Sequence, residues 1–536
     1  MRTCLLLGFV LALATAASAA TFYVDPANGK AANPGTKAAP WRTLEEVASS
    51  GALRGVKPGD SILLRSGLHG RVVLSGDNSE FVTVAADEGC KPKLSYFEIS
   101  QGSKWRVRGL TISASFGEPY EGVMLKFADG GASNEIIVED CFVFSTLDTS
   151  KWGAKEWMAA NSGIFMGRYG KGHLLRNNYV LNTRFGISLC AEESTCEGNV
   201  ISHFSADGIR VTRDGQVVQH NVIRNIYVSD EDGDKNHDDA IQCFLFNVGT
   251  GTVRNVTIRE NLIVMRENEE QKFKATMQGI GCFDGPLIGF TVEGNVINTS
   301  HWHGVSLYDA QNCTIKNNVA YTQWQTEKLR PWVQLGSKDT GEIKGNTVTG
   351  NYAYTFDLKN DKGVVAKDNN VVTEEIHTKR QAELLALIEK KYGKTIPAAG
   401  FKRLGLEHVR WIEGVPSTDG KVIDAVESAL NPDRPVVLYL YKEGDKACDR
   451  FERETLEDAT LNEQLDECNC IRINLDDLSR DAKKKYGIGT KTPAIIILKP
   501  EGEQFWDATS PTVKQLTKQI QAVRESPKPP PQPRGG

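Results

Sequence analysis

The chain has no excess of positive charge, because its 63 Lys and Arg residues face 68 Asp and Glu residues and leave a net charge of −5. A nucleic-acid-binding protein would carry a basic face, so that class of partner is not expected. After residue 20 there is also no apolar run that approaches the roughly 20 residues needed to span a bilayer. We therefore expect neither nucleic-acid binding nor a membrane span.

Cysteine is sparse as well, with 11 among 536 residues. The spacings do not form the framework of a small disulfide-stapled domain. We expect buried free thiols where cysteines take the place of small core residues, at Cys141, Cys243, Cys282 and Cys313. Cys190 and Cys196 are candidates for a pair across a turn.

Residues 1–20 have the pattern of a secretory signal peptide. Arg2 supplies the positive end, residues 5–14 the apolar run, and residues 17–20 the small side chains of a cleavage site. The mature chain would begin near Thr21 in a secreted or periplasmic location. Its length predicts two or more domains.

Two short motifs recur through the middle of the chain. One is a small residue followed by Ile or Val, at Gly163-Ile164, Gly186-Ile187, Gly208-Ile209, Ala240-Ile241, Gly279-Ile280 and Gly304-Val305. The other is Asn followed by aliphatic residues, at Asn199, Asn221, Asn261, Asn295 and Asn318, with looser matches at Asn178 and Asn346. The base period of about 22 residues indicates one coil of a solenoid, in which stacked coils share a core. A turn Asn can bond the backbone of the next coil.

The segment 21–113 alternates short strand-like runs with turn signals and one short helix, Leu44 to Ser50. It resembles the N-terminal cap of right-handed parallel β-helix proteins of the pectate-lyase-like superfamily. Together with the repeats, this resemblance implies a right-handed parallel β-helix with its cap over 21–373, and a mostly β fold class.

The pattern changes beyond the repeats. Residues 374–430 are predicted to form a helix, with Ala382, Leu385, Ile388 and Tyr392 on one face, and a connector. Residues 431–523 alternate strands and helices, as in a small α/β domain. The Pro-rich tail, 524–536, is expected to be disordered.

The segment 431–523 resembles the thioredoxin-like family, with Thr492-Pro493 at the family's cis-proline turn. Asp445 stands where the family has the first Cys of Cys-x-x-Cys, so only Cys448 remains. Dithiol exchange needs the missing thiolate. We therefore expect no ordinary oxidoreductase activity, and the domain is a candidate docking module for a protein partner.

An acidic stretch, residues 230–243, falls in the longest interval between repeats, where loops of a rigid stack usually carry function. Aligning the coils on the pair of a small and an aliphatic residue produces two columns of polar residues. Directly before the pair stand Asp207, Asp239, Gln278 and His303, and directly after it stand Arg210, Gln242 and Ser306. Coils lie about 4.8 Å apart, so Asp207 and Asp239 should be neighbours. Because unpaired buried carboxylates are costly, we expect both to reach water in a turn.

The leading hypothesis is a polysaccharide lyase acting on uronate-containing glycans. The sugar carboxylate would be neutralised by Arg210 or Arg213, or by Ca²⁺, which prefers several oxygens from a flexible loop. The Ca²⁺ ligands would be Asp230, Asp232, Asp234 and Asp238. The base would be His237, Lys235 or His303, and Tyr308 a proton donor. Substrate would also contact Gln242, Arg213, Ser306 and Gln278.

A glycoside hydrolase is the main alternative, with Asp207, Asp238 and Asp239 as acid and base. Asp207-Gly208-Ile209, followed by Asp238-Asp239-Ala240-Ile241 and later His303-Gly304, resembles the polygalacturonase pattern. An extra coil precedes the His, however, and no Arg-Ile-Lys follows it. Three carboxylates on one rung repel one another unless something uses them. A non-catalytic glycan-binding or cell-surface protein and a C5-epimerase also stay open.

Overall fold

A computed structural model describes residues 19–526, apart from internal gaps at 132, 147–148, 150, 228–236, 245–250, 268–270, 275, 325–328, 339–340, 359–361, 393–411, 414–433, 443–444, 457–460, 462–463, 466–467, 478–490 and 500–502. Residues 1–18 of the predicted signal peptide and the tail beyond 526 lie outside the described residues. The chain divides into two compact units, the first ending at Tyr392 and the second lying mainly beyond it.

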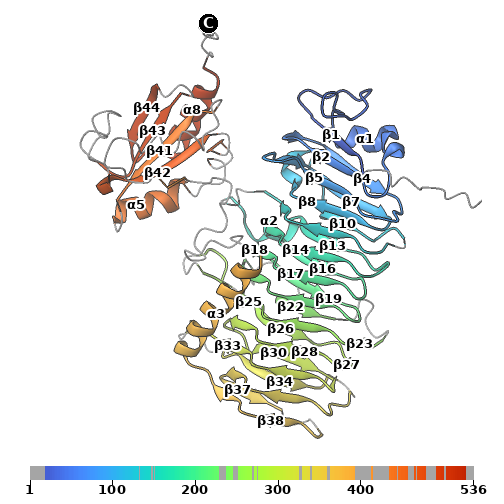
Figure 1. The fold of residues 1–536 in the computed structure, drawn as a ribbon. Helices are drawn as coiled ribbons and strands as arrows, with labels where there is room; N and C mark the ends of the chain where they lie inside the picture. Colours follow the sequence, from blue (N-terminus) through green and yellow to red (C-terminus); the bar gives the residue numbers. More distant parts are fainter. Residues whose placement is uncertain are drawn as a thin grey trace, which may run out of the picture. The chain divides into compact units, whose positions relative to one another are not determined.

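The first unit is a solenoid of stacked parallel strands (Figure 1). Each coil adds one strand to each of three sheets, so every strand pairs in parallel with its counterpart in the next coil. One sheet has 13 strands, from β1 (Thr21–Val24) to β38 (Val365–Lys367), and a second has 12, from β3 (Gly67–Leu68) to β39 (Asn370–Val371). This arrangement agrees with the predicted mostly β solenoid.

The third sheet, called the site sheet below, has 11 strands. They are, in order, β4 (Arg71–Ser75), β7 (Tyr96–Gln101), β10 (Val123–Phe127), β13 (Ser162–Met166), β16 (Ile187–Leu189), β19 (Ile209–Val211), β22 (Asp239–Cys243), β26 (Gln278–Cys282), β30 (His303–Tyr308), β34 (Trp332–Gly336) and β37 (Thr355–Asp357). Ile209, Ile241, Ile280 and Val305 are register partners, as the motif alignment predicts. All four are fully buried.

Asparagines, all but the last of them buried, form a ladder at one turn of the solenoid. In a typical rung, the backbone N–H and Nδ2 of Asn221 both donate to Oδ1 of Asn261 at 3.0 Å, and Nδ2 also donates to the Cys196 carbonyl. The ladder runs through Asn178, Asn199, Asn221, Asn261, Asn295, Asn318, Asn351 and Asn369. Assigning Asn346 to this column is wrong, because its Oδ1 instead accepts the N–H of Cys313 at a different turn.

Helices α1 (Leu44–Ser50) and α3 (Glu374–Tyr392) flank the solenoid. Helix α1 has the predicted bounds, and the Thr43 side chain caps its N-terminus. Helix α3 lies along the 12-stranded sheet (Figure 1), beside β25 (Leu262–Val264), β29 (Val296–Asn298) and β33 (Val319–Tyr321). Its buried residues are His377, Leu384 and Ile388. The predicted face is therefore partly wrong, since Ala382 is exposed.

The second unit contains a five-stranded sheet in the order β40 (Ile412–Glu413), β42 (Asn469–Asn474), β41 (Val436–Tyr441), β43 (Ala494–Leu498) and β44 (Gln504–Thr509). The first three strands are parallel, β43 runs antiparallel to β41, and β44 runs antiparallel to β43. Helices α5 (Lys446–Phe451) and α8 (Val513–Arg524) contribute side chains to one of its cores. The Thr492–Pro493 peptide is cis, as predicted.

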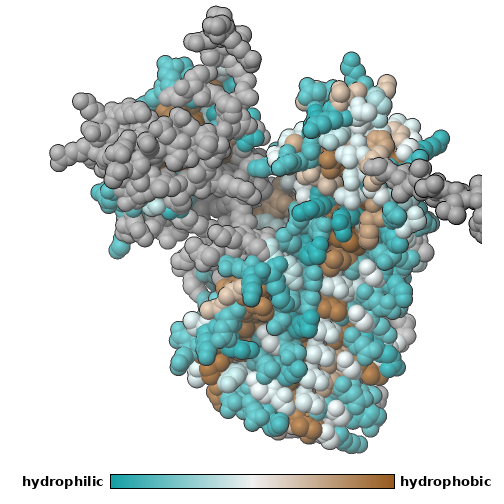
Figure 2. All heavy atoms as spheres, viewed as in Figure 1, coloured by the Kyte–Doolittle hydropathy of each residue, from teal (hydrophilic) through white to brown (hydrophobic). Residues whose placement is uncertain are grey.

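Among the residues that the structure describes, no helix has the length and apolarity to cross a bilayer. The ten cysteines within these residues are free. The pair considered for Cys190 and Cys196 is therefore not formed, and Cys141, Cys243, Cys282 and Cys313 are buried, as expected. Over the side of the solenoid seen in Figure 2, hydrophilic residues predominate, with hydrophobic ones among them.

Candidate active site

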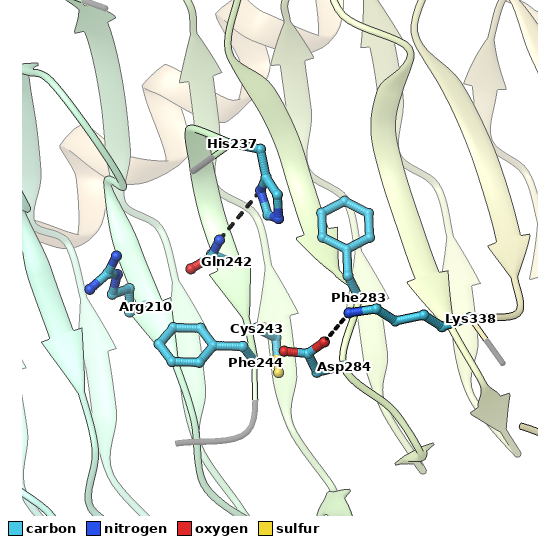
Figure 3. Close-up of a pocket in the computed structure, with 8 residues that line it drawn as sticks. All are labelled: Arg210, His237, Gln242, Cys243, Phe244, Phe283, Asp284 and Lys338. Atoms are coloured by element: carbon cyan, nitrogen blue, oxygen red, sulfur yellow. Dashed lines mark hydrogen bonds and ion pairs between the residues drawn. The ribbon is translucent and has the colours of Figure 1, made fainter. Parts of the chain in front are cut away.

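A pocket of about 310 Å³ opens on the outer face of the site sheet. Its lining residues are Arg210, His237, Gln242, Cys243, Phe244, Phe283, Asp284 and Lys338. Figure 3 shows Arg210 and His237 on either side of Gln242, and an ion pair between Asp284 and Lys338 at the other side. The volume suits a small ligand, or one sugar of a longer one, since such pockets begin at about 300 Å³.

Arg210 is held from two directions. Its Nε donates to Oδ2 of Asp207 at 2.6 Å, and its guanidinium lies 3.6 Å from the centroid of the Phe185 ring. The other oxygen of Asp207 accepts the backbone N–H of Asp239 at 3.1 Å. Within the described part of the chain, no group bonds the terminal Nη atoms of Arg210, so these donors remain for a ligand in the pocket.

His237 is oriented by a buried carboxylate. Its Nδ1 lies 2.5 Å from Oδ2 of Asp239, and Gln242 donates to the same oxygen at 3.2 Å. The His237 side chain is 45% exposed, whereas that of Asp239 is fully buried. With Nδ1 engaged, Nε2 is the ring nitrogen that a ligand can reach.

The carboxylate of Asp239 occupies space that Gly281 leaves open. Gly281 stands in the outward column of the site sheet, in register with Gln242 and Ser306. A Cβ at this position would lie 2.2 Å from Oδ1 of Asp239 and 2.5 Å from the Phe283 ring. Oδ1 of Asp239 is buried and has no hydrogen-bond partner among the described residues.

Burial dominates the electrostatics of this group. It raises the pKa of Asp207, and the charge and hydrogen bond of Arg210 offset it only in part. Burial also raises the pKa of Asp239, to about 7, against the hydrogen bond and charge of His237. For His237 burial opposes protonation, but the hydrogen bond and charge of Asp239 outweigh it and raise the pKa. Asp239 and His237 therefore hold a shared proton into the neutral pH range and release it as pH rises.

Aromatic rings continue from the pocket along the site sheet. The Phe283 centroid lies 4.9 Å from His237, 5.0 Å from His303 and 5.2 Å from Tyr308. Burial lowers the pKa of His303 to about 4, so its ring is neutral at neutral pH, and its Nδ1 lies 2.7 Å from the Ser306 hydroxyl. Burial raises the pKa of Tyr308, whose phenol therefore keeps its proton.

The structure brings most of the predicted site residues together, with one correction. The expectation that Asp207 and Asp239 reach water is wrong, because both side chains are fully buried. They avoid the cost of bare burial by bonding Arg210, His237, Gln242 and a backbone N–H. These carboxylates therefore act on the pocket through the side chains they hold.

The remaining predicted residues lie in different surroundings. Asp238 is half-buried and Gln278 is buried, while Arg213 follows β19 and does not line the pocket. Lys235 and the proposed calcium ligands Asp230, Asp232 and Asp234 lie outside the described residues. In the described ranges, no three His, Cys, Asp or Glu side chains gather in a way that could hold a metal ion.

Sequence reasoning missed Phe244, Phe283, Asp284 and Lys338. A signal for the two phenylalanines was available in the aligned coils. Phe244, Phe283 and Tyr308 each stand three positions after the aligned aliphatic residue, so they form a third column. Asp284 and Lys338 carry no repeat signal, because their 2.6 Å ion pair joins turns from separate coils.

A comparison with protein-family models supports the fold of the solenoid. The family model described as "Right handed beta helix region" matches residues 162–326. Similar solved structures include a lacto-N-biosidase from Eubacterium ramulus (15% identity, TM-score 0.42, covering 66% of this chain and 67% of that one). Also similar is an alginate lyase from Paenibacillus sp. str. FPU-7, with 14% identity and a TM-score of 0.36, covering 65% of this chain and 99% of that one. A pectate lyase has 13% identity and a TM-score of 0.36, covering 67% of this chain and 82% of that one. No curated protein matches the chain.

Proposed function

We propose that this chain is a carbohydrate-active enzyme, and specifically a polysaccharide lyase acting on uronate-containing glycans. One observation carries the proposal. The guanidinium of Arg210, whose terminal donors have no hydrogen-bond partner among the described residues, lines the same pocket as His237, whose Nδ1 is held by a buried carboxylate. The first group suits the carboxylate of an acidic sugar, and the second suits removal of a proton beside it.

The proposed reaction is a β-elimination. Arg210 binds the sugar carboxylate and favours the negative charge that develops there. Nε2 of His237 removes the proton from the ring carbon next to the carboxylate. The freed electron pair forms a double bond to the neighbouring carbon, whose bond to the glycosidic oxygen breaks. Tyr308, across the Phe283 ring, gives a proton to that oxygen, while Asp239 stabilises the imidazolium of His237.

The hydrolase alternative ranks second on the same geometry. It needs two carboxyl groups flanking the scissile bond. Asp207 and Asp239 are covered, which leaves only half-buried Asp238 of the three at the surface. An epimerase would share the proton abstraction at His237 and differ only in leaving the chain uncut.

Incubation with a panel of acidic polysaccharides tests the proposal. A lyase produces an unsaturated uronate, seen as a rise in ultraviolet absorbance, and His237→Ala should abolish it. New reducing ends without that absorbance would assign a hydrolase. Proton exchange with solvent without cleavage would assign an epimerase. Binding that survives Asp239→Asn, with no product from any glycan, would assign a non-catalytic protein.

Two further parts of the proposal rest on the sequence. The signal-like residues 1–20 support export to a secreted or periplasmic location. A Ca²⁺ ion held by the acidic loop would assist Arg210 in neutralising the sugar carboxylate. Activity lost on chelation and restored by Ca²⁺ would support the ion, and activity unchanged by chelation would remove it from the proposal.

We also propose that the second unit is a thioredoxin-like module without dithiol exchange. The Thr492 hydroxyl donates to Oδ2 of Asp445 at 3.1 Å beside the cis Pro493, and the N–H of Ala447 donates to Oδ1 at 2.8 Å. Cys448 is buried. A protein-disulfide reduction assay should show no rate above the uncatalysed one, and a clear rate would contradict the proposal.

A further inference from the structure

Two tryptophans lie at the start of neighbouring strands of the site sheet, beyond the pocket. Trp302 directly precedes β30, and Trp332 is the first residue of β34. Their rings are stacked, with centroids 6.0 Å apart and an angle of 19° between planes. Trp302 is 48% exposed, which makes it one of the largest apolar side chains open to solvent in the described structure.

Hydrogen bonds hold the indole ring of Trp332 and the backbone of Trp302 in position. The indole N–H of Trp332 lies 3.2 Å from the Ser306 hydroxyl and 3.3 Å from Nδ1 of His303. The Trp302 carbonyl accepts the backbone N–H groups of Gly304 and Trp332 at 2.9 and 2.7 Å. An aromatic surface held in this way loses little conformational entropy when it binds a ligand.

Contacting rings connect the pair to the pocket. Centroid distances are 4.9 Å from His237 to Phe283, 5.0 Å from Phe283 to His303, and 5.4 Å from His303 to Trp332. The four rings belong to the successive coils of β22, β26, β30 and β34. At about 4.8 Å per coil, the series extends about 14 Å along the site sheet.

The two ends of this series differ in charge. The pocket end carries Arg210 and His237, whose pKa is raised. At the other end, burial lowers the pKa of His301 and of His303 to about 4, so both rings are neutral at neutral pH. The pocket end therefore suits an anionic group, and the tryptophan end suits an uncharged apolar surface.

We propose that Trp302 and Trp332 form a second subsite, which stacks against the C–H face of a sugar ring in the glycan whose acidic sugar binds at Arg210. This inference rests on the proposed function and adds to it that the substrate spans several coils. A flat indole with an apolar face and a polar N–H edge suits a sugar ring, which also has both kinds of surface. Short oligosaccharides that fill only the pocket would not reach the pair.

The test measures the binding of oligosaccharides of increasing length, made from polygalacturonate and from alginate, by calorimetry. The protein used is the His237→Ala variant, so that no turnover occurs. Adding Trp302→Ala should weaken binding of the longest oligomers about threefold to tenfold, the size of one aromatic contact, and leave the shortest unchanged. Trp302→Phe should restore most of the loss. Tyr169→Ala, which removes a 44% exposed ring elsewhere, is the matched control.

The outcomes separate this inference from the proposed function. Equal weakening at every length, or none at any length, would overturn the subsite even if wild-type enzyme produces unsaturated uronates. Neutral oligosaccharides from galactan and chitin form a third arm. If only these bind, with the same dependence on Trp302 and on length, the subsite stands and the uronate lyase proposal falls. If no series shows that dependence, the subsite is overturned.

Discussion

The solenoid buries polar side chains in two regions and satisfies them to different degrees. In the turn ladder, Asn221 and Asn261 are neutral, and each amide bonds the next rung and a backbone carbonyl. Beneath the pocket, Asp207 and Asp239 have pKa values raised by burial, and one oxygen of Asp239 has no partner among the described residues. The ladder is complete within the protein, whereas the carboxylates hold side chains that point to a ligand. The ladder should therefore govern stability, and the carboxylates activity.

Asp239→Asn is expected to have the largest effect. The amide can still fill the space over Gly281, but it no longer stabilises the imidazolium of His237. We expect kcat/KM to fall by about 10³-fold, within the range of general-base catalysis. Stability should be unchanged or higher, because a buried ionisable group is removed. Kinetics and thermal unfolding of the same preparation measure both, and a large loss of stability would show that Asp239 belongs with the ladder.

Asn261→Ala should do the reverse. The change leaves the N–H and Nδ2 of Asn221 and the Val218 carbonyl without these partners, while Oδ1 of Asn295 still accepts the backbone N–H of residue 261. Since each unsatisfied buried group costs about 1–3 kcal/mol, we expect a loss of at least about 3 kcal/mol in the free energy of unfolding. Urea unfolding measures it, with exposed Asn370→Ala as the control. A large fall in kcat/KM of the folded fraction would contradict the assignment of stability to the ladder and activity to the carboxylates.

Two glycines in one strand sharpen the comparison. In Gly281→Ala the new methyl group meets the Asp239 carboxylate and the Phe283 ring, so we expect kcat/KM to fall about tenfold with little change in stability. In Gly279→Ala it lies 2.3 Å from the Gly304 carbonyl in the next coil, so we expect about 1–3 kcal/mol of destabilisation. Equal effects of the two variants on both measurements would argue against separate regions.

The sequence predicts the ladder better than the site, for a physical reason. The ladder repeats, so its spacing and the register of Ile209 with Ile241 could be predicted from the period alone. The burial of Asp239 depends on Phe283, one coil later, and on the missing side chain at Gly281. Neither fact can be predicted from the repeat, so the cost of burying unpaired carboxylates favours their placement in water. The prediction for Asn346 is wrong because the interval between coils is longer here, and the Asn that continues the ladder after Asn318 is Asn351.

The smallest expected effect is the pH dependence, which has opposite signs for stability and activity. Burial raises the pKa of Asp239 to about 7, so its protonated form stabilises the fold, and this contribution is lost as pH rises from about 4 toward 7. The raised pKa of His237 acts in the same direction, since its contribution is lost as pH rises through the folded-state pKa. The Tm of Asp239→Asn relative to wild type should therefore increase between pH 5 and pH 8, by about 2–4 °C for each kcal/mol.

Activity should change the other way, because only neutral His237 can accept a proton, and a raised pKa moves the rise of kcat/KM to higher pH. The ladder contains no titratable group, so the Tm difference between Asn261→Ala and wild type should not vary over the same pH range. A pH profile of kcat/KM, with Tm measured in the same buffers, tests both expectations. If kcat/KM fell as His237 lost its proton, that residue would act as an acid, and the base would have to be sought at neutral His303.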